Sequence, residues 1–126
     1  HHAVLGSMGR FIGILLEHHE GRLPLWLAPR QIAVLPVGER QEGFAARVSD
    51  VLRAAGASVD HLASGETLSR RLVAARERLI PIFLVIGARE ESTGQMVLQV
   101  GESGLPVHMD DLGRVVRELI GTCRDL

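Results

Sequence analysis

One uninterrupted apolar run, IPIFLVIG at residues 80–87, most constrains what this chain can fold into. A strand that is apolar at every position is typical of the buried interior of a sheet, because an exposed face would show polar residues at every second position. A second run of this type, IAVLPV, occupies residues 32–37. Both runs predict buried strands, and the run at 80–87 is expected to be the central one.

Amphipathic segments lie between the apolar runs. The apolar side chains of residues 41–55 recur at helical spacing, and Gly56 ends that segment. Residues 66–79 repeat the pattern, with Leu68, Leu72 and Ala75 expected to face inward. The four arginines of this second helix are expected to face largely outward: Arg70, Arg71, Arg76 and Arg78.

Shorter signals complete the alternation of strands and helices. Residues 58–63 predict a short strand, and residues 95–100 predict another after a polar turn. The turn sequence GESG follows at 101–104, and a last helix is expected from about Asp110 to Ile120. Strands that alternate with helices indicate an α/β fold with a largely parallel sheet. The short turn before residues 95–100 adds an antiparallel strand, so the sheet is expected to be mixed.

Composition limits the classes of function. The 126 residues fit one ordinary domain, and no apolar run reaches the roughly 18 residues that span a membrane. The single Cys123 allows no internal disulfide, which suits the cytoplasm. All 14 basic residues are arginine, which reflects either codon usage or a need to grip phosphate. The net charge of −1 argues against a general nucleic-acid binder, so any such contact must be local.

Catalytic and metal motifs are weak in this sequence. The cluster His18-His19-Glu20 invites a metal interpretation, but adjacent helical side chains diverge, so a solvated helix end is the simpler interpretation. The chain has no GxSxG turn, no GxGxxG turn and no GxxxxGK[ST] loop. The C-terminal hundred residues therefore predict a binding module and not a catalyst.

Longer motifs resemble the threonyl-tRNA synthetase family. Residues 7–20, which begin within GSMGRF, predict a helix; PLWLAP and the strand QIAVLPV follow, and GETLSRRLVAARERLIPIFLVIGARE continues the similarity. The resemblance implies that residues 1–30 are the end of a class II catalytic domain with its linker. Residues 31–126 would be an anticodon-binding domain with a mixed sheet of about five strands and three flanking helices.

The resemblance also implies roles near the start of the chain. Arg10 would hold ATP phosphates, and Ser7 would lie beside the aminoacyl-adenylate. His1 would be one of three ligands to a catalytic zinc ion, unless His1 and His2 come from an affinity tag. ATP and zinc would belong to a longer parent protein, which the family expects to be a homodimer. This segment alone is expected to hold no cofactor, to be monomeric and to be inactive.

The candidate contacts to tRNA lie in the second part of the chain. They are Glu66, Arg70, Arg71, Arg89, Glu90 and Gln99. The sequence departs from the family pattern, because Gln99 and Gly101 stand where arginines contact the anticodon, and Val73 replaces another arginine. Two hypotheses follow. The chain belongs to a threonine–tRNA ligase with reduced anticodon reading, or to a paralogue or accessory protein that uses the fold for protein interaction or dimerisation.

Overall fold

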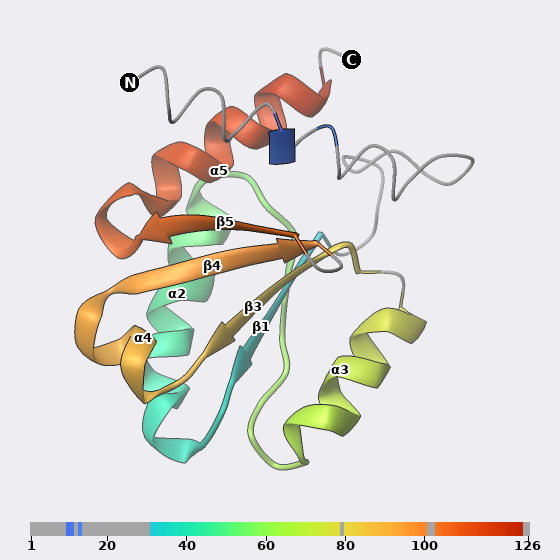
Figure 1. The fold of residues 1–126 in the computed structure, drawn as a ribbon, viewed down its shortest axis with the longest axis vertical. Helices are drawn as coiled ribbons and strands as arrows, with labels where there is room; N and C mark the ends of the chain where they lie inside the picture. The colour runs from blue at the N-terminus through green and yellow to red at the C-terminus, as the bar shows by residue number, and fades with distance from the viewer. Residues whose placement is uncertain (1–9, 12, 14–30, 79, 101–102, 125–126) are drawn as a thin grey trace.

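The computed structural model describes residues 10, 11, 13, 31–78, 80–100 and 103–124, and Figure 1 shows their arrangement around one sheet. Most of the helix expected at 7–20 lies outside the described residues, as does the expected domain boundary near residue 30. Arg10, Phe11 and Gly13 are helical, as predicted. The side chain of Phe11 is buried and packs in the same apolar cluster as the sheet.

Five strands form one mixed sheet in the order β2-β1-β3-β4-β5. Their bounds are β1 Ile32–Pro36, β2 Val59–His61, β3 Ile82–Ile86, β4 Gln95–Val100 and β5 Ser103–His108. Strand β1 is parallel to both β2 and β3, whereas β4 is antiparallel to β3 and to β5. The prediction of a mixed sheet is therefore confirmed, with the parallel pairs at one side and the antiparallel pairs at the other.

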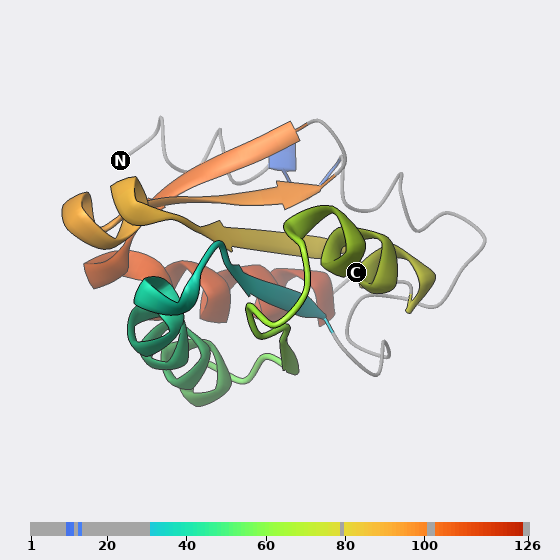
Figure 2. The same cartoon turned by 90° about the horizontal axis from the view of Figure 1, so that it is seen from below.

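Helices cover the two faces of the sheet unequally (Figures 1 and 2). The helices are α2 Glu42–Ala54, α3 Leu68–Glu77, α4 Ala88–Thr93 and α5 Met109–Arg124, with a 3₁₀ turn η2 at Glu39–Gln41. Helices α2 and α5 lie under one face, and among the described helices α3 covers the other. The short helix α4 lies at the end of β3 and covers neither face.

Two apolar clusters explain why β1 has no polar side chain. Ile32 and Val34 point into the cluster under α2 and α5, while Ala33 and Leu35 point into the smaller cluster under α3. All of β1 is therefore buried, with exposed fractions of at most 1% for these four residues. The same two-sided burial accounts for the apolar run in β3.

The face that α3 covers is open over β4. Met96, Leu98 and Val100 are buried in the larger cluster, but the alternate residues Gln95, Val97 and Gln99 are exposed. The alternation of exposed and buried residues along β4 thus shows that one face of this strand is in contact with solvent. The open face, which we define by Gln95, Val97 and Gln99, lies beside the part of the sheet that α3 packs on.

The sequence pattern missed two elements. Helix α4 forms where a polar turn was expected, because Gly87 caps it and the Glu90 carboxylate accepts a bond from the Gly87 N–H at 2.8 Å. Strand β5 begins inside the GESG segment that was expected to be a turn. Its Gly104 and Pro106 weaken the strand signal, although proline is tolerated in a strand at the edge of a sheet.

The prediction that Arg71 faces outward is wrong. Arg71 is only 4% exposed, while Arg70, Arg76 and Arg78 are exposed as expected. In a helix with 100° per residue, Arg71 lies about 60° from Leu68, at the border of the inward stripe. The sequence interpretation assigned it by charge, and the helical geometry overrides that assignment.

No helix among the residues that the structure describes is long and apolar enough to cross a membrane.

A glycine at the end of α4 offers a test of this packing. Gly94 has φ +76°, and a Cβ there would lie 2.8 Å from Nε2 of His108. We expect Gly94→Ala to lower the free energy of unfolding by about 1–3 kcal/mol, because it adds backbone strain and a clash. Gly43→Ala is the matched control, since a Cβ at Gly43 meets nothing within 4 Å. Chemical denaturation measures both, and equal stability of the two variants would contradict the packing described.

Candidate nucleic-acid interface

The carboxyl ends of β1, β2 and β3 meet at one border of the sheet, because these strands are parallel. The segments that leave them build what we call the carboxyl edge: residues 37–42, 61–71 and 87–91. In open α/β sheets this border is where ligands bind, because side chains and peptide groups from several loops converge there. The carboxyl edge is therefore the candidate site.

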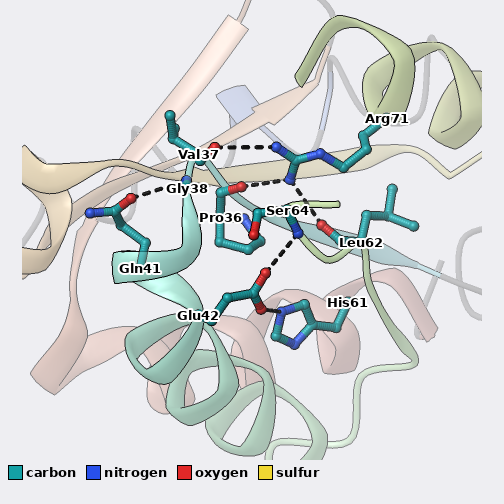
Figure 3. A network of polar contacts seen from close by, with 9 residues as sticks. All are labelled: Pro36, Val37, Gly38, Gln41, Glu42, His61, Leu62, Ser64 and Arg71. Carbon is teal, nitrogen blue, oxygen red and sulfur yellow. Dashed lines mark hydrogen bonds and ion pairs between the residues drawn. The ribbon is translucent and has the colours of Figure 1, made fainter. Parts of the chain in front are cut away.

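A buried guanidinium joins two of these segments (Figure 3). Arg71 Nη1 donates hydrogen bonds to the carbonyl oxygens of Pro36 and Leu62, at 2.5 and 2.9 Å. Its Nε donates to the Glu66 oxygen at 3.0 Å, and its Nη2 donates to the Val37 oxygen at 3.4 Å. Within the described part of the chain, the Arg71 guanidinium has no carboxylate partner. Its acceptors are all backbone carbonyls.

The Glu42 carboxylate holds the β2–α3 segment from the other side. Its Oε2 accepts a bond from the Ser64 N–H at 2.7 Å, and its Oε1 lies 3.0 Å from His61 Nε2. The pKa of Glu42 lies below its ordinary value, chiefly because the Ser64 backbone N–H stabilises the charged form; burial opposes this, and His61 adds to it. The loop 61–64 is therefore fixed by a carboxylate from α2 and a guanidinium from α3.

Gln41 connects the third segment to the first. Its Oε1 accepts a hydrogen bond from the Gly38 N–H at 3.0 Å, which closes the turn after β1. Its Nε2 donates to Glu91 Oε1 at 3.4 Å, so η2 touches α4. The three segments of the carboxyl edge thus form one connected hydrogen-bonded unit, which fixes the backbone from which their charged side chains extend.

Three arginines of this edge are exposed and unpaired. Arg40 lies in η2, Arg70 in the first turn of α3 and Arg89 in the first turn of α4, so that one follows each parallel strand. Among the described residues, none of their side chains forms a hydrogen bond or an ion pair. A free guanidinium offers five donors in a fork that matches phosphate oxygens. Sequence reasoning missed Arg40; its place just after a buried strand was the available signal.

The structure places four of the six predicted contacts as accessible or half-buried groups of the carboxyl edge: Glu66, Arg70, Arg89 and Glu90. Arg71 belongs to the same edge but is buried under it. Gln99 lies apart, because its partner in the sheet is Phe83, near the start of β3 and so at the opposite end. The Glu90 carboxylate is already engaged by the Gly87 N–H.

The open face offers a different chemistry. Gln95 and Gln99 expose amide groups, which can donate and accept at once and so match the edge of a nucleic-acid base. Val97, 39% exposed, lies between them. The phenylalanines that the structure describes are all buried, at positions 11, 44 and 83. Base stacking on the described surface would therefore fall to guanidinium planes or to the half-buried rings of His61 and His108.

The residues implied at the catalytic end are mostly outside the described part. Arg10 is exposed on its short helical segment, whereas Ser7 and His1 lie outside the described residues. No group of three or more histidine, cysteine or acidic side chains that could hold a metal ion exists among the described residues. The zinc expectation depends on His1 and stays a prediction.

The Glu42 contacts predict a pH-dependent stability. A carboxylate with a lowered folded pKa stabilises the fold above about pH 4.5, its ordinary value, and this contribution is lost as the pH falls through the folded value. We expect Glu42→Gln to be roughly 1–2 kcal/mol less stable than the wild type at pH 7. The deficit should shrink as the pH falls below that ordinary value, because the stabilisation from the lowered pKa of Glu42 is lost as the carboxylate becomes protonated in the folded state.

Urea denaturation at several pH values measures this difference. Glu39→Gln is the control, since Glu39 is exposed and makes no side-chain contact with the other described residues. It should change the stability by less than about 0.5 kcal/mol at every pH. A Glu42→Gln deficit that is the same at pH 3 and pH 7 would refute the assignment.

Comparison with known proteins agrees with this geometry. The family described as "Anticodon binding domain" matches residues 31–119. The threonine–tRNA ligase of Syntrophotalea carbinolica is 40% identical over 120 residues, which cover 94% of this chain and 19% of the relative. The chloroplastic/mitochondrial threonine–tRNA ligase 2 of Arabidopsis thaliana is 43% identical over 115 residues, 89% of this chain and 17% of the relative.

A solved structure shows the same architecture. The RNA-binding domain of threonyl-tRNA synthetase from Cryptosporidium parvum superposes with a TM-score of 0.71 and 27% identity, over 82% of this chain and 27% of that one. The chain spans about a fifth of the length of the two curated relatives. The matched residues include the whole carboxyl edge and the open face. The chain therefore belongs to the anticodon-binding domain family, in the form found in threonine–tRNA ligases.

Proposed function

We propose that this chain holds the anticodon arm of a threonine tRNA while a threonine–tRNA ligase aminoacylates the other end. The proposal is carried by one observation: each of the three parallel strands is followed by an exposed, unpaired arginine, namely Arg40, Arg70 or Arg89. Together with the ligase relatives, this favours RNA over a protein partner, since phosphate is the ligand that free guanidinium groups match best.

The charge distribution supports a local contact. The chain as a whole carries a net charge of −1, so long-range attraction to RNA is weak. Several other arginines are paired with carboxylates, Arg53 with Asp50, Arg78 with Asp60 and Arg114 with Asp111. Arg76 and Arg117 are also exposed and have no ion pair among the described residues, so what distinguishes Arg40, Arg70 and Arg89 is that each follows a parallel strand at the same border of the sheet. Phosphate contacts of this kind set the position of the RNA but carry no sequence information.

Base reading is assigned to the open face and to Glu66. The amides of Gln95 and Gln99 can each form two hydrogen bonds with a base edge. Gln99 stands where the family has an arginine, so a neutral amide would contact the base in place of a charged guanidinium. We expect discrimination between anticodons that is present but modest.

The remaining expectations belong to a longer protein. ATP-dependent aminoacylation, with Arg10 holding ATP phosphates, Ser7 beside the adenylate and His1 as a zinc ligand, rests on the resemblance alone. The expectation that the longer protein is a homodimer, and that the isolated domain is a monomer, also rests on the resemblance alone. The alternative of a paralogue that uses this fold for protein interaction gains no support from the relatives, which are threonine–tRNA ligases by name.

Binding measured at several salt concentrations tests the proposal. We expect the chain to bind threonine tRNA with a log K that falls with log salt at a slope of roughly −2 to −3, one unit for each free arginine. An anticodon-swapped tRNA should bind less tightly with the same slope, because its phosphates are unchanged. No binding of either tRNA at low salt would refute the proposal.

Two variants and a control locate the contact. Arg70→Ala and Arg89→Ala should each weaken binding of both tRNAs equally and reduce the slope by about one. Arg117→Ala is the matched control, because Arg117 is exposed and has no partner in the described part of the chain, but lies on α5, under the opposite face of the sheet. A loss of affinity in Arg117→Ala that equals the loss in Arg89→Ala would place the RNA elsewhere.

A further inference from the structure

We propose that Arg71 is the positioning residue of the RNA-binding edge: it does not touch RNA but fixes the segments that present Arg40 and Arg70. This inference rests on the proposed function for its RNA partner, but its structural half can be tested without RNA.

The acceptors of Arg71 come from the two segments that carry these arginines. Pro36 and Val37 precede η2, in which Arg40 lies, and their carbonyls accept from Nη1 and Nη2. Leu62 and Glu66 precede α3, in which Arg70 lies, and their carbonyls accept from Nη1 and Nε. One side chain therefore ties together turns that are 25 or more residues apart in the sequence.

A neutral, apolar side chain at position 71 would leave the four carbonyl oxygens without the guanidinium that donates to them. Arg71 is 4% exposed, so water has little access to the guanidinium that holds them. Buried carbonyls that lose a hydrogen-bond donor are destabilised, and the turns would move to find water. Arg40 lies only three residues after Val37, so a shift of that turn displaces its guanidinium directly.

Val37 shows how firmly the first turn is held. Its side chain is apolar and 48% exposed. Its peptide groups are nevertheless fixed on both sides: the N–H donates to the Ile86 oxygen at 2.8 Å, and the carbonyl accepts from Arg71 at 3.4 Å. Because the Val37 side chain is half exposed, its burial does not account for the backbone conformation of this turn. The two hydrogen bonds hold that conformation.

The charge of Arg71 is not cancelled locally. Its described acceptors are neutral carbonyls, and both oxygens of the neighbouring Glu42 are engaged with Ser64 and His61. A cation under low-polarity surroundings is screened less than one in water. The carboxyl edge also carries five carboxylates, those of Glu39, Glu42, Glu66, Glu90 and Glu91, so the charge of Arg71 offsets part of theirs beneath the three exposed arginines.

The test compares Arg71→Met and Arg71→Lys with the wild type in the salt-titrated tRNA assay. We expect Arg71→Met to weaken binding of threonine tRNA on the order of tenfold and to make the salt slope shallower, because the displaced guanidinium groups of Arg40 and Arg70 then neutralise phosphates less fully. Arg71→Lys keeps the charge and some of the donors, so it should lose less affinity. A folded Arg71→Met that binds as the wild type does, with the same salt slope, would overturn the inference.

Amide hydrogen exchange supplies the second readout and needs no RNA. Amides of residues 37–40 and 62–66 should exchange faster in Arg71→Lys, and in Arg71→Met if it folds, while those of β4 and β5 should not change. Unchanged exchange in both segments would overturn the positioning role. If the wild type fails to bind tRNA but this exchange result holds, the proposed function fails and the positioning role stands.

Discussion

A guanidinium held by four backbone carbonyls is the interaction on which the carboxyl edge depends. Arg71 reaches from α3 across the end of β1 and fixes the turns after two parallel strands. Glu42 completes the arrangement from α2 by accepting the Ser64 N–H. The Arg71 guanidinium, which donates to carbonyls, and the Glu42 carboxylate, which accepts from an N–H, thus fix the loop 61–64 from two sides. The backbone positions of Arg40 and Arg70 depend on this pair.

Unequal coverage of the sheet creates the second surface. Helices α2 and α5 bury one face completely, whereas α3 packs only on β1 and β3. The open face of β4 therefore shows Gln95, Val97 and Gln99 to solvent. Charged groups at the carboxyl edge and amides on the open face divide the work as RNA recognition generally does, with phosphate contacts for position and base contacts for identity.

Much of the sheet could be predicted from the sequence because burial leaves a simple pattern. The apolar runs of β1 and β3 report coverage on both faces, and the alternation in β4 reports coverage on one. Helix α4 and strand β5 were missed for local reasons. A six-residue helix shows too little periodicity to register, and its capping by Glu90 depends on a contact that a polar stretch does not reveal. Gly104 and Pro106 resemble a turn as much as a strand.

The site was harder to predict because charge and accessibility are different properties. The sequence marks Arg70, Arg71 and Arg89 alike, yet only the structure shows that Arg71 is buried among carbonyls. Arg40 was missed although it follows a buried strand, because that position alone does not show that three strand ends meet at one border. Its significance comes from the parallel order of β2, β1 and β3, which places three strand ends at one border. Topology of this kind is a long-range property.

The central claim is that this chain grips the anticodon arm of tRNA. Nuclease footprinting of threonine tRNA with and without the chain tests it most directly. We expect the chain to protect the anticodon loop and the adjoining stem. This protection should be lost when Arg40, Arg70 and Arg89 are all replaced by alanine. Protection confined to the acceptor arm, or protection of the anticodon loop that survives the triple replacement, would contradict it.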